Sequence, residues 1–119
     1  MPIERLTVER LKRRADFLLV AGTRRKYVTP AFVLQARARD DMPQVRIGFT
    51  ATKKIGSAVA RNRARRRLRE AARALLPVAA TPGSDYVLVA RAGTLTHPYA
   101  TLLTDLRKAL AALAPKGTS

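Results

Sequence analysis

A dense group of arginine and lysine side chains lies between residues 53 and 73, where nine basic residues occur with a single acid, Glu70. Guanidinium groups grip phosphate oxygens through paired hydrogen bonds and also stack on flat bases. Like charges at this density repel one another, so a fold tolerates them best where a polyanion binds. The segment therefore predicts a phosphate-binding surface, and nucleic acid is the polyanion that fits it best.

An amphipathic helix is predicted to position these side chains. Ser57 is a favoured N-cap residue, and the helix is expected to run to about Leu76, where Pro77 ends it. On a helical wheel, a stripe of small and apolar residues lies within about 60° of one direction. This core-facing stripe consists of Ala64, Leu68, Ala71, Ala72 and Leu75. Arginines and Asn62 cover the rest of the helix surface.

The loop before this helix adds to the predicted surface. Lys53, Lys54 and Gly56 lead directly into the helix N-terminus, where free amides and the positive end of the dipole attract anions. Asn62 has two interpretations of equal weight: it contacts a phosphate, or it bonds to neighbouring backbone.

The remaining elements form a small sheet and two further helices. Residues 11–21 are predicted to form a short helix that Gly22 closes. Residues 29–38 and 45–50 alternate between apolar and polar side chains, which predicts an antiparallel hairpin with one buried face. Residues 86–90 are apolar throughout, as in a strand buried on both faces.

The C-terminal part is expected to contain a turn and a helix. Gly93 and Thr94 favour the turn, and Pro98 suits the first turn of a helix whose leucines fall on one stripe. The order αββαβα predicts a single α+β domain over residues 1–119, with residues 1–8 and 115–119 flexible.

Composition excludes several classes of protein. The 119 residues contain 24 basic and 8 acidic side chains, for a net charge of +16, and 47% are hydrophobic, which indicates a folded core. The absence of cysteine excludes thiolate metal sites and disulfides. No run of about 18 apolar residues occurs and the N-terminus does not resemble a signal peptide, so we expect an intracellular protein without a membrane span.

Protein-based hydrolysis has little support in the sequence. The single histidine, His97, precedes a proline and has no acid or nucleophile pattern beside it, and the acids are scattered along the chain. Phosphodiester cleavage by protein residues needs convergent carboxylates or a histidine pair. We therefore predict no catalytic and no metal-ligating residue.

The stretch from Arg46 to Glu70 closely resembles the bacterial ribonuclease P protein family. The resemblance rests on the loop Lys53-Lys54-Ile55-Gly56-Ser57-Ala58-Val59, which runs into Arg61-Asn62-Arg63 and the arginines that follow. More loosely it extends over nearly the whole chain, through Asp16-Phe17 and Asp85-Tyr86. It implies an αββαβα domain with a mixed sheet and a left-handed βαβ crossover, like domain 2 of ribosomal protein S5.

The resemblance also implies a function. The family's protein subunit binds a catalytic RNA that removes the 5′ leader from precursor tRNA in the cytoplasm, and it lets the complex work at lower Mg²⁺. The metal is expected to be held mainly by RNA. The residues implied to face the catalytic RNA are Lys53, Lys54, Arg61, Asn62, Arg63, Arg65, Arg66, Arg67 and Arg69.

A second implied surface binds the single-stranded leader in a cleft between the N-terminal helix and the sheet. Phe17 and Phe32 match the family's aromatic positions there, and Arg13 and Arg14 lie beside them. An aromatic face is a sequence-tolerant stacking platform, although a phenylalanine in a short element is commonly a core residue. Ala21 stands where a second aromatic is common in the family, so leader stacking is expected either to be weaker or to rely on Phe32 and Tyr27.

Two other classes fit less well. A structural RNA-binding protein, such as a small ribosomal protein, would share the charge and size but gives no reason for the ordered lysine-glycine and Arg61-Asn62-Arg63 block. A helix-turn-helix DNA reader would need more base-reading side chains, and guanidinium groups surround too much of this helix for one groove.

Overall fold

A computed structural model describes residues 5–39 and 42–115 of the chain. Its strands are β1 (Val8–Arg10), β2 (Lys26–Val28), β3 (Phe32–Ala38), β4 (Val45–Thr50) and β5 (Ser84–Ala90). Its helices are α1 (Arg14–Gly22), α2 (Ala58–Ala79), α3 (Ala92–Thr96) and α4 (Tyr99–Leu113), with the 3-10 turn η1 (Lys53–Ile55) before α2.

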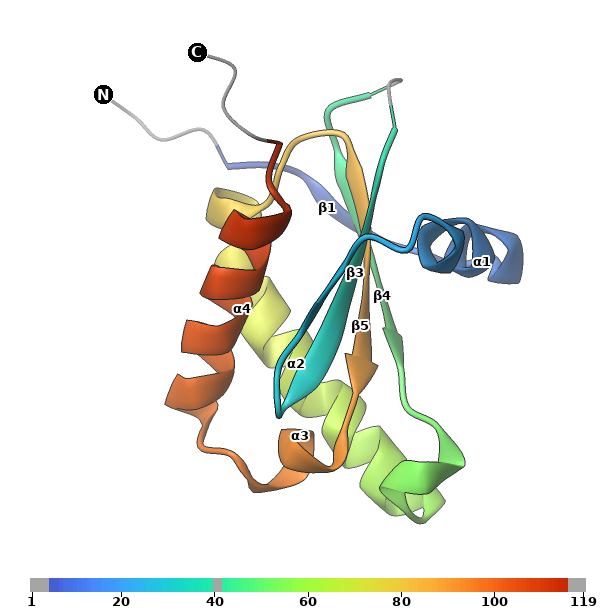
Figure 1. Cartoon of the computed structure of the whole chain (residues 1–119), viewed down its shortest axis with the longest axis vertical. Coiled ribbons are helices and arrows are strands. Elements are labelled where there is room, and N and C mark those ends of the chain that lie inside the picture. The colour runs from blue at the N-terminus through green and yellow to red at the C-terminus, as the bar shows by residue number, and fades with distance from the viewer. Residues whose placement is uncertain (1–4, 40–41, 116–119) are drawn as a thin grey trace.

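The five strands form one mixed sheet in the order β1-β4-β5-β3-β2. β4 pairs in parallel with both β1 and β5, whereas β3 is antiparallel to β5 and β2. Figure 1 shows the sheet nearly edge-on, with α2 and α4 on one side and α1 on the other. The predicted α+β domain with a mixed sheet is confirmed.

The main core lies between the sheet and the pair α2 and α4. The predicted stripe of α2 is buried there, and Leu76 joins it. From α4, Leu102, Leu106 and Leu110 meet the sheet residues of the same face. The central strand β5 is apolar on both sides because helices cover both faces of the sheet, as its sequence predicts.

The predicted hairpin is wrong. β3 and β4 both match the expected residues, but β5 lies between them and pairs with each. Alternation reveals which face of a strand is buried, but it carries no information about which strand is the neighbour. The chain instead leaves β4, crosses through α2 and returns as β5 in parallel. The left-handedness of this crossover stays a prediction.

The N-terminal segment also differs from the prediction. Of the expected flexible segment 1–8, residues 1–4 lie outside the described residues, whereas residues 6–8 are hydrogen-bonded to the rest of the fold, which corrects the expectation for them. Leu6 N donates to Pro77 O at 2.8 Å, and Val45 N donates to Thr7 O at 2.8 Å, so β1 forms a parallel edge strand on β4. Leu11 N then donates to Ile47 O, which delays the start of α1 to Arg14. Of the expected C-terminal flexible segment, residues 116–119 lie outside the described residues.

Two helix boundaries need correction as well. Pro77 does not end α2, which continues to Ala79 because a proline in the last turn forfeits only one helical hydrogen bond. The turn expected at Gly93 and Thr94 is the short helix α3. Thr94 is buried, and its hydroxyl donates to Ala31 O, so this segment packs against the end of the sheet.

The edge strand β2 was not predicted from the sequence.

Candidate nucleic-acid interface

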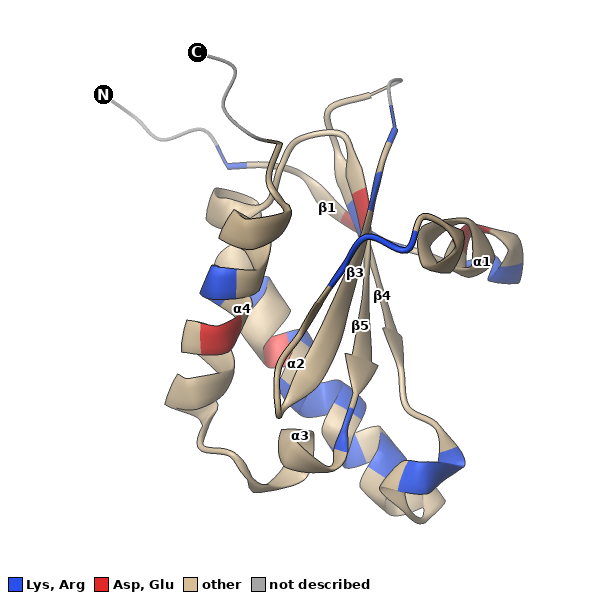
Figure 2. Cartoon of the chain, viewed as in Figure 1, with Lys and Arg blue, Asp and Glu red and all other residues tan. Residues whose placement is uncertain are grey.

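The N-terminal half of α2 extends past the end of the sheet. Figure 2 shows that basic residues gather on this half and on η1. Ser57 caps α2, since its Oγ accepts a hydrogen bond from Ala60 N at 3.2 Å, as the sequence predicts. Gly56 joins η1 to the cap with φ at +134°, a conformation that favours glycine. The glycine therefore sets the angle between the lysine turn and the arginine helix.

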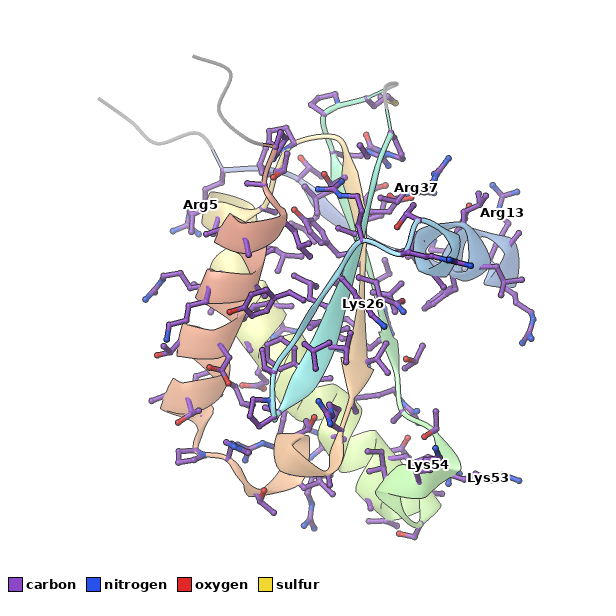
Figure 3. All side chains as sticks on the ribbon, in the orientation of Figure 1. Arg5, Arg13, Lys26, Arg37, Lys53 and Lys54 are labelled. Carbon is purple, nitrogen blue, oxygen red and sulfur yellow. The ribbon has the colours of Figure 1, made fainter. Side chains whose placement is uncertain are left out.

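One group of predicted residues is exposed on this projecting end. Lys53 and Lys54 point away from the protein at η1 (Figure 3). Asn62, Arg63 and Arg66 line a shallow hollow of about 240 Å³ along α2, together with Val59. The spacing of these four positions places them on one face of the helix. The exposed group is Lys53, Lys54, Asn62, Arg63 and Arg66.

The other predicted arginines have partners within the protein. The Arg61 guanidinium donates to Gly56 O at 2.9 Å, which braces the loop, and Arg67 donates to His97 O near α4. Arg69 lies over the Phe49 ring, 5.8 Å from its centroid. These three side chains are half-buried, so they hold the surface in place as well as adding charge to it.

Asn62 has a partner that neither interpretation anticipated. Its Oδ1 accepts a hydrogen bond from Arg65 Nη2 at 2.5 Å, and both groups are exposed. Asn62 therefore orients the Arg65 guanidinium on the helix surface. The bond is between side chains three residues apart, a spacing that helix geometry allows.

The opposite face of the sheet carries α1 and a second, smaller core. Leu11, Val20 and Val87 are buried there, with Phe17 and Val89 partly buried against them. Thr23 fastens the end of α1 to the sheet, because its Oγ1 donates to Val20 O at 2.9 Å and lies 2.8 Å from Ala36 O. α1 therefore packs on this face of the sheet, and the leader-binding cleft expected between them stays a prediction.

Phe17 lies on this face and Phe32 does not. Phe17 is half-buried and packs directly over Gly48 of β4. Phe32 is 1% exposed within the main core, on the side covered by α2 and α4. A base can stack only on an accessible ring face, so the assignment of Phe32 to leader binding is wrong. The alternation of β3 carried this signal, since Phe32 belongs to its apolar series.

Arg13 and Arg14 are exposed at the start of α1, and their contact with the leader stays a prediction. Arg13 pairs with Asp16 at 3.6 Å and projects from the outer end of the helix (Figure 3). Sequence reasoning missed Gln35 and Arg37, which are half-exposed on the α1 side of β3. They occupy the polar series of the strand, and that alternation could have identified them.

A buried carboxylate binds several arginines on the face of the sheet that carries α1. Asp85 is fully buried and accepts two hydrogen bonds from Arg46, at 2.8 and 2.6 Å. Arg39 donates to the same carboxylate at 3.2 Å, and Arg37 lies 3.7 Å away. Arg46 also lies 3.6 Å from Asp16 of α1. This network ties α1 to β3, β4 and β5 while leaving a positive excess on the surface.

Within residues 5–39 and 42–115, no group of three or more His, Cys, Asp or Glu side chains is placed to hold a metal ion. His97 Nδ1 lies 2.7 Å from Gly93 O, so the imidazole is engaged with local backbone. Over the same described residues, no helix combines the length and apolarity needed to span a lipid bilayer.

Comparison with known proteins decides the family. The model of the Ribonuclease P family matches residues 7–114. The chain belongs to the ribonuclease P protein family. Among relatives of this family, the Ribonuclease P protein component of Caulobacter vibrioides is 54% identical over 109 residues, which cover 92% of this chain and 73% of that protein. That of Paramagnetospirillum magneticum is 50% identical, covering 87% of this chain and 80% of that one.

Solved structures of the family agree with the fold. The ribonuclease P protein of Thermotoga maritima has a TM-score of 0.69 and 27% identity, covering 93% of this chain and 99% of that one. The Staphylococcus aureus protein has a TM-score of 0.73 at 23% identity and covers 87% and 93% of the two chains. As a ribonuclease P protein, this chain is a component of a ribonuclease that processes tRNA.

Proposed function

We propose that this chain binds the catalytic RNA of ribonuclease P through η1 and α2, and the 5′ leader of precursor tRNA through α1 and the facing sheet surface. The observation that carries the proposal is the projection of the arginine-rich end of α2 beyond the sheet, where its exposed side chains are free to meet a large polyanion. Cleavage of the precursor then yields the mature 5′ end of the tRNA.

The RNA-facing surface suits a folded RNA. Its exposed cations lie on the short turn η1 and along the rigid helix α2, and half-buried arginines keep their positions through bonds to the protein. Phosphate neutralisation by such side chains releases counterions and supplies affinity that does not depend on sequence. A subunit that binds one particular RNA gains specificity from the fixed spacing of these contacts.

The leader-facing surface suits a single strand. Phe17 offers a ring held against the sheet, and Arg13, Arg14 and Arg37 supply cations around it. Ala21 is exposed and offers no ring, so the aromatic contact at this face of α1 rests on Phe17. Stacking on one ring and contact with phosphates together tolerate any leader sequence.

We assign the hydrolysis of the phosphodiester bond to the RNA subunit. The acids and His97 form no cluster within the described residues that fits Mg²⁺, so we derive no step through a protein-bound metal. We propose that RNA phosphates and bases hold the Mg²⁺ that the complex requires. The protein's part is to lower the repulsion between two RNA molecules and to position the leader. Such a complex is expected to work in the cytoplasm, where tRNA precursors are made.

Reconstitution tests this proposal. A leader-bearing precursor tRNA is incubated at low Mg²⁺ with bacterial ribonuclease P RNA alone, with this protein alone, or with both. We expect cleavage only in the combined sample. Cleavage by the protein alone would overturn the assignment of chemistry to RNA, and no stimulation of a compatible RNA would favour a purely structural RNA-binding role.

A further inference from the structure

A groove that the proposed function does not use lies between β1 and α2. It has a volume of about 400 Å³, within the range of sites for small molecules. Its floor is apolar and comes from β1, β4 and α2, and its rim is charged. The charged lining residues are Glu9, Arg10, Arg69 and Arg73, and the ring of Phe49 is part of the floor.

The sheet register explains why this groove is open. The pairing of β1 with β4 ends at Arg10 and Ile47, and the chain then turns to the other face of the sheet at Leu11. Phe49 therefore lies two residues beyond the end of the edge strand. On α2, Arg69 and Arg73 are four residues apart, so both project from one face of the helix beside this gap.

The charge of the groove is positive. Arg10 and Arg73 are exposed at its rim, and Arg69 lies over the Phe49 ring. The one acid, Glu9, already accepts a hydrogen bond from Gln44 Nε2 at 3.2 Å. Within the described chain, Arg69 Nε is buried and has no hydrogen-bond partner. A buried donor without an acceptor costs free energy, which an oxygen or ring nitrogen from a ligand would recover.

We propose that this groove binds one unstacked nucleotide of the RNA subunit. Its base packs against Phe49 and the apolar floor and accepts a hydrogen bond from Arg69, while its phosphate lies between Arg10 and Arg73. The occupant belongs to the RNA subunit because the groove shares α2 with the RNA-facing surface and lies on the opposite side of the sheet from Phe17. This inference rests on the proposed function.

Mononucleotide titration tests the groove directly. The amide resonances of the full chain, labelled with ¹⁵N, are followed as adenosine 5′-monophosphate is added, with ribose 5-phosphate as the ligand without a base. We expect saturable shifts at residues 8–10 and 69–73, with ribose 5-phosphate binding at least fivefold more weakly. Equal binding of the two ligands, or shifts confined to residues 59–66, would overturn the proposal.

Variants add a second readout. Phe49→Leu keeps an apolar side chain but removes the ring, and we expect about tenfold weaker binding of the mononucleotide. Arg73→Gln removes a rim charge at an exposed position and is expected to weaken binding without disturbing the core. Arg107→Gln on α4 is the matched control, since it removes an exposed charge elsewhere. If Phe49→Leu and Arg107→Gln both bind like the parent protein, the ring has no part in the groove.

Crosslinking identifies the source of the nucleotide. The chain has no cysteine, so Glu9→Cys carries a photoreactive probe at one defined place, and Lys108→Cys serves as the control. In the complex with precursor tRNA, we expect crosslinks from position 9 to the RNA subunit, and crosslinks to precursor tRNA alone would contradict the assignment. Stimulation of cleavage by the parent protein without mononucleotide binding refutes this inference only. Binding without stimulation refutes the proposed function, and with it the assignment of the nucleotide to the RNA subunit, but not the affinity of the groove for a nucleotide.

Discussion

The ring of Phe17 lies against the backbone of Gly48, so closely that a Cβ at residue 48 would stand 2.3 Å from Cε2 of the ring. The pair joins α1 to β4 at the centre of the proposed leader-binding face. Any side chain at residue 48 would push the ring away from the sheet. The position of the single aromatic residue of α1 therefore depends on a glycine thirty-one residues later in the chain.

Gly48→Ala is expected to displace the Phe17 ring and to lower the free energy of unfolding by about 1 kcal/mol. This loss of stability is near the lower end of the range for overpacked substitutions because the half-buried ring can rotate outward. Urea unfolding measures the change. Gly22→Ala at the end of α1 is the matched control, since a Cβ there meets no atom within 4 Å and the substitution should not lower stability. Equal effects of the two substitutions would contradict the close packing.

The sequence predicted α2 and its surface well because helical periodicity is local. The buried stripe and the Ser57 cap follow from neighbouring residues, and both are present. Strand neighbours depend on distant residues, so the pairing of β5 between β3 and β4 could not be read from alternation. The three-residue strands β1 and β2 carry too short a pattern to be recognised.

The candidate site divides in the same way. Residue type identified the cations of α2, but only the structure shows that Arg61, Arg67 and Arg69 are engaged with Gly56, His97 and Phe49. The family resemblance assigns Phe32 to the leader-binding surface, whereas the alternation of β3 predicts a core position. The structure places the ring in the core.

Asp85→Asn is expected to destabilise the protein by about 3 kcal/mol, because it removes the charge that pairs with Arg46 in a fully buried position. Chemical denaturation at neutral pH measures the loss. Glu70→Gln on the exposed side of α2 removes a carboxylate without burial and should change stability by less than about 0.5 kcal/mol. A loss below about 1 kcal/mol in Asp85→Asn would show that the network does not hold α1 to the sheet.

Binding to the RNA subunit is expected to weaken with salt. If the surface covers about 5–8 phosphates, the logarithm of affinity falls with the logarithm of salt concentration at a slope of roughly −4 to −6. Arg63→Ala or Arg66→Ala should reduce the magnitude of this slope by about 1, and Arg107→Ala on α4 should leave it unchanged. Filter binding over a range of salt concentrations provides the slopes, and a slope near zero for the parent protein would refute the electrostatic assignment.

The central claim is that the projecting end of α2 and the α1 side of the sheet bind two different RNAs, and a crossed comparison of Phe17→Ala and Arg66→Ala tests it most directly. The measurement is the dissociation constant of each variant for the RNA subunit, and of each reconstituted complex for precursor tRNA with a long or a short leader. We predict that Arg66→Ala weakens RNA-subunit binding and leaves the preference for long leaders intact. Phe17→Ala should leave RNA-subunit binding intact and reduce that preference about tenfold. If both variants weaken both interactions equally, or if Phe17→Ala affects long and short leaders alike, the division of RNA binding between these two surfaces is wrong.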